Sequence, residues 1–151
     1  MSSYRIVPAS IRHVRPMAAC MRAAGFMALA RYGDGARQAL HGAFVASHHC
    51  RTALIENKPV AMWGAVGPLL GEQVHVWLVL SDMICSMPRA IVREARTDLE
   101  GLMDHYADIS AVILPDDVAS VRFAGFLGFH QSGDRIPVGD GYFVPMRLEA
   151  H

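Results

Sequence analysis

Residues 109–129, ISAVILPDDVASVRFAGFLGF, contain the pattern that decides the fold. The stretch opens on an apolar run that predicts a short, buried strand. Asp116 or Asp117 can cap the helix that follows over 117–127, because a carboxylate accepts the unpaired N–H groups of a first helical turn. Gly128 ends this helix, since glycine readily adopts the left-handed conformation common just after a helix. A strand followed directly by a helix is typical of an α/β domain.

An earlier strand and helix repeat this arrangement. Gln73–Ser81 is largely apolar on both faces, as expected for a strand that helices cover on both sides. Residues 81–87 then predict a loop. Pro88 suits the first position of a helix over 88–106, where its missing N–H would have no partner in any case.

The remaining elements lie on either side of these two units. Apolar residues at three- and four-residue spacing predict two N-terminal helices, and Asn57-Lys58 predicts the turn of a hairpin. The expected elements are strand Tyr4–Pro8, helices over 11–24 and 34–47, strands Cys50–Glu56 and Pro59–Val66, and two short strands within 130–149, the last being Tyr142–Leu148. This order, β-α-α-β-β-β-α-β-α-β-β, predicts an α/β (α+β) fold, a mixed central sheet with helices on both faces.

The composition predicts one soluble domain over 1–151. Of 151 residues, 52% are hydrophobic and 19% charged, which is enough apolar surface for a core. No apolar stretch is long enough for a membrane span and no leader precedes the first strand, so we expect a cytoplasmic protein. Three widely spaced cysteines indicate reduced thiols. A net charge of zero disfavours nucleic acid as a partner.

Charge is unevenly distributed along the chain. Residues 1–33 hold five arginines and no acid, whereas residues 94–117 hold seven acids and one arginine. These segments can attract each other within the chain, or between subunits of a homo-oligomer or larger protein assembly; the alternative is a solvated face on two helices. His48-His49-Cys50 suggests a metal site, but adjacent residues of a strand point to opposite faces, so we expect no metal.

The element order resembles that of the GNAT superfamily of acyl-CoA-dependent N-acyltransferases, over residues 4–149. The segment Asp117–Phe129, DVASVRFAGFLGF, is similar to the family's late helix, Asn-x-x-Ala-x-x-Leu-Tyr-x-x-x-Gly-Phe. Asp117 stands at the Asn position, Ser120 at the Ala position, and the closing Gly-Phe pair is present. The resemblance implies an acetyl-CoA or CoA site, and a strand ending near Ser81 that splays from its successor.

A second resemblance is to a compact, phage-encoded subgroup of acetyltransferase-like proteins, some of them associated with virions. It is carried by the strand end WLVLSD at 77–82, by Pro88, and by the arginines of the following helix, Arg89, Arg93 and Arg96. This resemblance implies a location in the host cytoplasm or in a virion.

The cofactor loop departs from the family pattern, Gln/Arg-x-x-Gly-x-Gly/Ala. Ser86 replaces the first glycine of this pattern, and Pro88 replaces its second small residue. Proline has no N–H to offer a phosphate. Ser81, Ser86 and Arg89 can still hold a phosphate through hydroxyls and a guanidinium; the alternative is a plain loop capped by Ser86. The resemblance also assigns Leu80, Asp117 and Ser120 to the cofactor site. The family's tyrosine, which protonates the leaving thiolate, is replaced by Ala124.

Three residues on or beside the central strand are candidates for the general base. His75 has a suitable pKa range, and its alternative is a hydrogen-bonded core histidine. Glu72, at the strand start, also fits an exposed loop acid, and Asp82, at its end, also fits a turn or cap residue. Trp63 and Trp77, on adjacent strands, either line a substrate cleft or belong to the core.

Two functions are compatible with these residues. One is an enzyme that moves an acetyl group from acetyl-CoA to a small amine or a protein, for which the fold resemblance is the support. The other is a non-catalytic binding or assembly module of the same fold, in a phage particle or an infected cell.

Overall fold

The computed structural model describes residues 4–20, 36–67, 73–81, 89–113, 118–138 and 141–149. Its elements follow the predicted order, with one short strand added near the C-terminus. The strands are β1 Tyr4–Pro8, β2 Ser47–Ile55, β3 Lys58–Val66, β4 Gln73–Leu80, β5 Asp108–Ile113, β6 His130–Gln131, β7 Ile136–Val138 and β8 Gly141–Glu149. The helices are α1 Ile11–Cys20, α2 Ala36–Ala46, α3 Arg89–Met103 and α4 Val118–Leu127.

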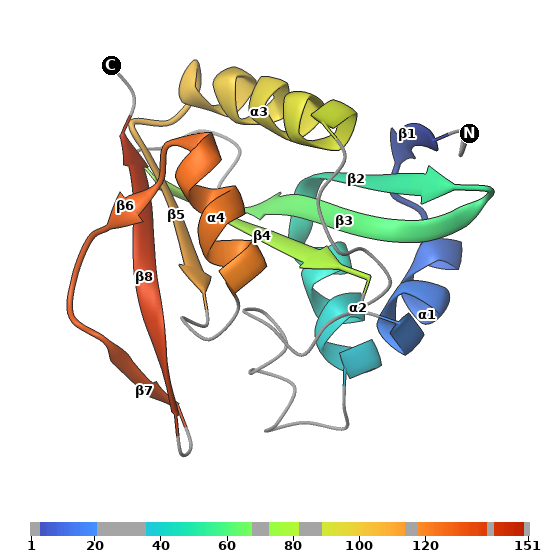
Figure 1. Ribbon diagram of the computed structural model, residues 1–151, viewed down its shortest axis with the longest axis horizontal. Helices are drawn as coiled ribbons and strands as arrows, with labels where there is room; N and C mark the ends of the chain where they lie inside the picture. The colour runs from blue at the N-terminus through green and yellow to red at the C-terminus, as the bar shows by residue number, and fades with distance from the viewer. Residues whose placement is uncertain are drawn as a thin grey trace.

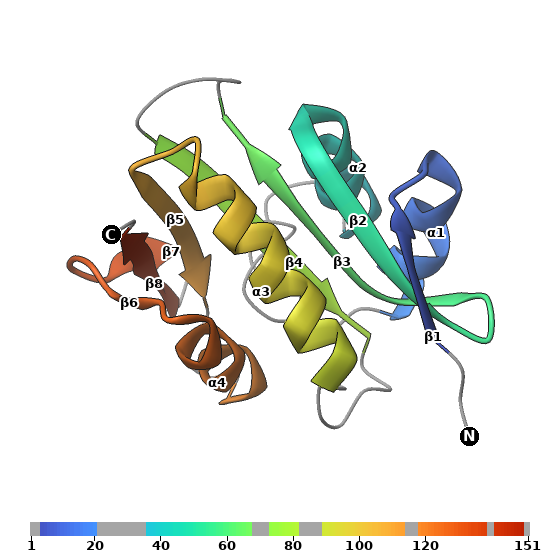
Figure 2. The same cartoon turned by 90° about the horizontal axis from the view of Figure 1, so that it is seen from above.

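The strands form a mixed sheet in the order β1-β2-β3-β4-β5-β8-β6, with β7 paired to β8. β4 and β5 run parallel, and the other ladders are antiparallel. Helices α1 and α2 cover one face, while α3 and α4 cover the other (Figures 1 and 2). The predicted α/β fold with a mixed, doubly covered sheet is therefore confirmed.

The two faces of β4 supply two different parts of the core. Trp77 and Val79 pack with Val14 and Met17 of α1 on the face that α1 and α2 cover, here called the α2 face. Leu78 and Leu80 belong to the cluster that includes Ile91 and Ala95 of α3, on the face here called the α3 face. The alternation predicted from the sequence is thus present, and both sides of β4 are buried because each has its own helical layer.

β4 and β5 are paired over only part of their length. The ladder joins Gln73 to Asp108, Val74 to Ile109 and His75 to Ser110. It stops there, although β4 continues to Leu80 and β5 to Ile113. The expected separation of this strand from its successor is therefore confirmed.

The start and end of β2 differ from the prediction. The hairpin turn consists of Glu56 and Asn57, one residue earlier than expected. Their φ angles are 51° and 67°, as this turn type requires positive φ at both central residues. The strand begins at Ser47, and a β-bulge shifts the register between Ser47 and His49. The bulge gives adjacent residues the same face, because it adds an unpaired residue to one strand.

The bulge overturns the expectation that His48 and His49 point to opposite faces. His48 Nε2 lies 3.1 Å from the Tyr106 hydroxyl, and His49 Nε2 lies 3.4 Å from Asp98 Oδ2. Tyr106 belongs to the core cluster that includes Leu99 of α3, and Asp98 lies on α3 itself, so both rings lie on the α3 side of the sheet. Within the described residues, no three side chains of the metal-ligating types are placed to hold an ion.

Three acidic residues of the 94–117 segment form salt bridges with arginines that lie outside the basic N-terminal segment. Arg51 contacts Glu94 and Asp98, and Arg147 contacts Asp108. From the basic segment, Arg5 donates instead to Asn57 Oδ1 at 2.8 Å. In the part of the chain that is described, no helix is long and apolar enough to cross a membrane.

Candidate functional site

A cavity of about 410 Å³ lies at the point where β4 and β5 separate. Residues 75–78 of β4 and Ala111 of β5 line it. Its lining includes side chains from both faces of the sheet, so the cavity extends from the α2 layer to the α3 layer. Its volume falls within the range of small-molecule sites in proteins.

The lining is largely apolar on both faces. On the α2 face, the lining includes Ala39 and Gly42 of α2 and His75 and Trp77 of β4. On the α3 face the wall consists of Trp63, Leu78, Ala95, Leu99, Leu127 and Phe129. A few polar groups interrupt this surface, chiefly His75 on the α2 side and Asp98 on the α3 side. Apolar walls with few polar groups exclude water and orient a ligand.

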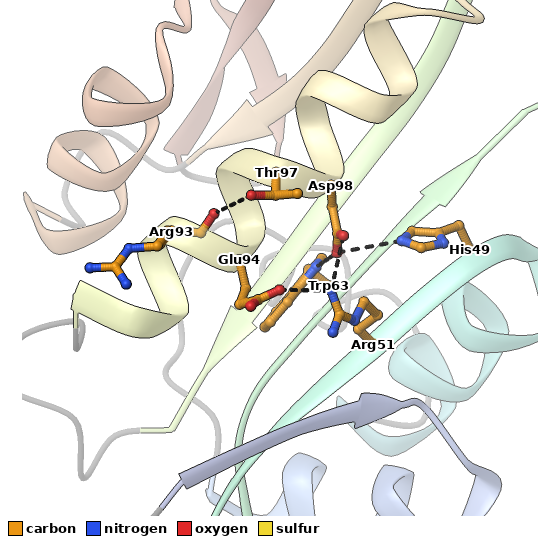
Figure 3. Close-up of polar contacts among 7 residues, drawn as sticks. All are labelled: His49, Arg51, Trp63, Arg93, Glu94, Thr97 and Asp98. Atoms are coloured by element: carbon orange, nitrogen blue, oxygen red, sulfur yellow. Dashed lines mark hydrogen bonds and ion pairs between the residues drawn. The ribbon is translucent and has the colours of Figure 1, made fainter.

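The Trp63 wall is held by an ionic network (Figure 3). The indole N–H donates to Asp98 Oδ2 at 2.8 Å. Arg51 donates to Asp98 Oδ1 at 3.0 Å and to Glu94 Oε2 at 3.2 Å, and His49 approaches the same Asp98 carboxylate. Charge-assisted hydrogen bonds of this kind are about twice as strong as neutral ones. The indole is therefore fixed against α3.

The Trp77 wall is held by neutral groups. Its indole N–H donates to Ser47 Oγ at 2.8 Å, and Ser47 in turn donates to the Ala43 carbonyl of α2 at 2.7 Å. Gly64 makes room for this indole, because a Cβ there would lie 2.9 Å from two of its ring carbons and 2.8 Å from Ser47 Oγ. This glycine is thus required by close approach of a side chain.

His75 stands at the end of the β4–β5 ladder, facing the cavity. Its Nδ1 lies 3.1 Å from Ser110 Oγ on β5. Burial lowers the pKa of His75 below its ordinary value, because a partly desolvated imidazole resists gaining charge. A neutral imidazole of this kind can accept a proton near neutral pH.

A second hollow, of about 480 Å³, lies beside the bulge. Its lining includes His48, His49, His105 and Tyr106. It adjoins the Trp63 network, because Asp98 and His49 line both hollows. Cys50 next to the bulge is a poor nucleophile, since burial raises the pKa of its thiol to about 12.

The structure brings three of the sequence-predicted site residues together: His75, Trp63 and Trp77 all line the cavity. The two tryptophans stand on opposite faces of adjacent strands, so they form two walls and not one.

Of the predicted cofactor-binding residues, Leu80 and Ser81 are buried at the end of β4 and are not among the residues lining the cavity. Arg89 is exposed at the start of α3. Glu72, Asp82, Ser86 and Asp117 lie outside the described residues, as does the side chain of Ser120.

Sequence reasoning missed Asp98 and Ser110. Asp98 falls in a charged helix, where its spacing alone gives no sign that it faces a tryptophan. Ser110 had a visible signal, because it is the one hydroxyl in the otherwise apolar run at 109–114. A lone polar residue on a buried strand needs a hydrogen-bond partner, and that partner is His75.

Known proteins share this architecture. No protein-family model and no curated protein matches the sequence. Among solved structures, a putative phosphinothricin N-acetyltransferase aligns with 99% of both chains at 14% identity and a TM-score of 0.70. A GNAT-family acetyltransferase from Streptococcus pneumoniae aligns with 99% of this chain and 100% of its own at 10% identity and a TM-score of 0.62.

A third structure, AAC(6')-Ib in complex with ribostamycin and coenzyme A, aligns with 97% of this chain and 93% of its own, at 13% identity and a TM-score of 0.63. None of these three names refers to a phage or a virion, so the phage resemblance gains no support from them. At these identities the likeness establishes the fold alone, and that fold is the one shared by the GNAT acetyltransferases.

Proposed function

We propose that residues 1–151 act as a single cytoplasmic domain that binds an acyl-CoA, in the simplest case acetyl-CoA, and transfers the acyl group to an amine. The observation that carries this proposal is the cavity at the end of the β4–β5 ladder. A ligand there would lie between two strands and reach His75 on the α2 face. The solved structure of AAC(6')-Ib, which shares the fold, contains coenzyme A.

The separated strand edge supports binding of an extended, amide-containing molecule. Beyond His75, β4 makes no ladder bonds with β5. A pantetheine arm would lie beside β4 beyond this rung, with its amides facing the strand backbone in the way that an added strand pairs with a sheet edge. The apolar lining suits the methylene groups of the same arm. The described lining therefore fits the pantetheine arm of the group.

The chain's own residues would divide the work as follows. Trp63 and Trp77 form walls that exclude water. His75 takes a proton from the attacking ammonium group, with Asp82 and Glu72 as the alternative bases. Arg89, which is exposed, would hold the pyrophosphate together with Ser86, Asp117 and Ser120 of the predicted cofactor site, whereas Leu80 and Ser81 of that predicted site are buried at the end of β4. Acetyl-CoA supplies an activated acyl carbon when bound.

Isothermal titration with CoA and acetyl-CoA tests the binding step. We expect heat and a saturable isotherm for the wild-type chain, and none for Ala111→Phe, which fills the cavity where the strands separate. Gly101→Ala is the matched control: a Cβ there meets nothing within 4 Å, and the residue does not line the cavity. Loss of binding in both variants, or no heat for the wild-type chain at high micromolar ligand, would count against the proposal.

The alternative is a non-catalytic binding or assembly module, which the sequence associates with a phage particle. The observation in its favour is that two large apolar side chains of α4 are exposed, Phe126 by 67% and Val121 by 41%. The salt bridges weaken the hypothesis that the acidic segment binds a basic surface of another subunit. Glu94, Asp98 and Asp108 already pair with arginines of the same chain. Light scattering tests it: stable association without CoA binding favours the module, and a monomer at all salt concentrations opposes it.

A further inference from the structure

The side chains of Ser110 and His75 meet at the last rung of the parallel β4–β5 ladder. The register places His75 opposite Ser110. His75 Nδ1 and Ser110 Oγ are 3.1 Å apart, and Ser110 Oγ is 3.5 Å from the Val74 carbonyl oxygen. Within the described part of the chain, the His75 ring forms its hydrogen bond with Ser110.

The chemistry of these three groups limits where the protons can lie. The 3.1 Å contact between Ser110 Oγ and His75 Nδ1 can form with the shared proton on either group. A carbonyl oxygen can only accept, so the longer 3.5 Å contact with Val74 gives the Ser110 hydroxyl hydrogen a second acceptor. When the hydroxyl donates to Val74, its oxygen accepts from the imidazole, Nδ1 carries the ring proton and Nε2 holds the free lone pair. In this arrangement both the hydroxyl and the Nδ1–H have an acceptor.

We infer that Ser110 is a positioning residue that fixes the tautomer of His75, with Nδ1 protonated and Nε2 as the nitrogen that accepts a proton in the cavity. This inference rests on the proposed function for its catalytic consequence. The tautomer itself rests on the contacts alone, and second-shell hydrogen bonds of this kind commonly set which imidazole nitrogen is basic.

The surroundings of His75 leave its ring neutral. Asp108 and Arg147 occupy neighbouring register positions on β5 and β8 and form a salt bridge, so their charges offset each other. On the facing helix, Gln38 lines the cavity and His41 is exposed. Burial lowers the pKa of His75, so the neutral form, in which the tautomer matters, predominates at pH 7.

Nitrogen-15 NMR tests the tautomer without any ligand. Long-range proton–nitrogen spectra distinguish the two neutral imidazole tautomers by the nitrogen shifts, and His75→Gln identifies the His75 signals by their loss. We expect the Nδ1–H tautomer in the wild-type chain and a shift toward Nε2–H in Ser110→Ala. Ser110→Thr, which keeps the hydroxyl, restores the wild-type spectrum. Thr97→Ala removes an exposed hydroxyl on α3 and leaves the spectrum unchanged.

Transfer kinetics test the catalytic consequence. We expect kcat/KM for acetyl transfer to fall about 10- to 100-fold in Ser110→Ala and to recover in Ser110→Thr. The acid limb of the pH profile of kcat/KM should move in Ser110→Ala and stay in place in Ser110→Thr. An Nε2–H tautomer in the wild-type chain, or an unchanged tautomer in Ser110→Ala, overturns the inference. A wild-type chain with the Nδ1–H tautomer and no CoA binding overturns the proposed function instead, while the positioning of His75 by Ser110 stands.

Discussion

Trp63 and Trp77 lie on neighbouring strands, are 7% and 6% exposed, and each donates an indole hydrogen bond of 2.8 Å. Their acceptors differ. Trp63 donates to a carboxylate that Arg51 also holds, whereas Trp77 donates to a serine hydroxyl that is bonded to the α2 backbone. Because charge-assisted bonds are stronger than neutral ones, we infer that the α3 wall of the cavity is rigid and the α2 wall is the more adaptable one.

The largest effect is expected for Asp98→Ala. It leaves the Arg51 guanidinium and the Trp63 indole N–H without their shared acceptor, in a site where the Asp98 side chain is 12% exposed. We expect a loss of about 3 kcal/mol in the free energy of unfolding, measured by urea denaturation. Glu100→Ala, an exposed acid on the same helix, is the matched control. Equal losses in the two variants would remove the distinction between the walls.

Gly64→Ala comes next, because it acts on the other wall. The new methyl group would meet the Trp77 ring and Ser47 Oγ at distances below van der Waals contact. We expect a loss of about 2 kcal/mol, typical of overpacking in a core. Gly101→Ala has open space and sits in α3, so it should gain up to about 1 kcal/mol from helix propensity. Thermal unfolding of both variants measures the contrast, and a neutral Gly64→Ala would contradict it.

A smaller effect is expected for Ser47→Ala. This change removes a neutral acceptor from Trp77 and should cost about 1 kcal/mol in urea denaturation. The comparison is sharpened by a double-mutant cycle, in which Ser47→Ala is repeated in a Trp77→Phe background that lacks the donor. The cost should then decrease. If Ser47→Ala costs as much as Asp98→Ala, the α2 wall is as firmly held as the α3 wall.

The smallest effect concerns pH and involves His75 on the α2 face of the cavity. The pKa of His75 is lowered by burial, and the pKa of His13 by burial and by Arg12. The unfolded chain therefore binds more protons than the folded one as pH falls below 6.5, so stability present above that pH is lost on acidification through the folded-state pKa values. Urea midpoints measured from pH 7.5 to pH 5 should fall less in His75→Gln than in the wild-type chain. Identical pH dependence in the two would contradict this assignment.

The sequence predicted the features that depend on local periodicity. The two apolar faces of Gln73–Ser81, the helix ended by Gly128 and the order of elements are all present, and Gly128 has the expected positive φ of 97°. The bulge at His48 was not predictable, because it depends on how β2 pairs with β3 and not on the composition of either strand. The hairpin turn was misplaced by one residue for the same reason.

By itself, the sequence determined that this chain folds into a mixed sheet between two helical layers, since alternation and helical spacing are properties of neighbouring residues. Only the tertiary structure decided which polar side chains meet. Asp98 reaches Trp63 and Arg51 across 35 and 47 residues of chain, and His75 reaches Ser110 across 35. Such contacts depend on the packing of α3 on the sheet and on the point where β4 and β5 separate, neither of which a local pattern encodes.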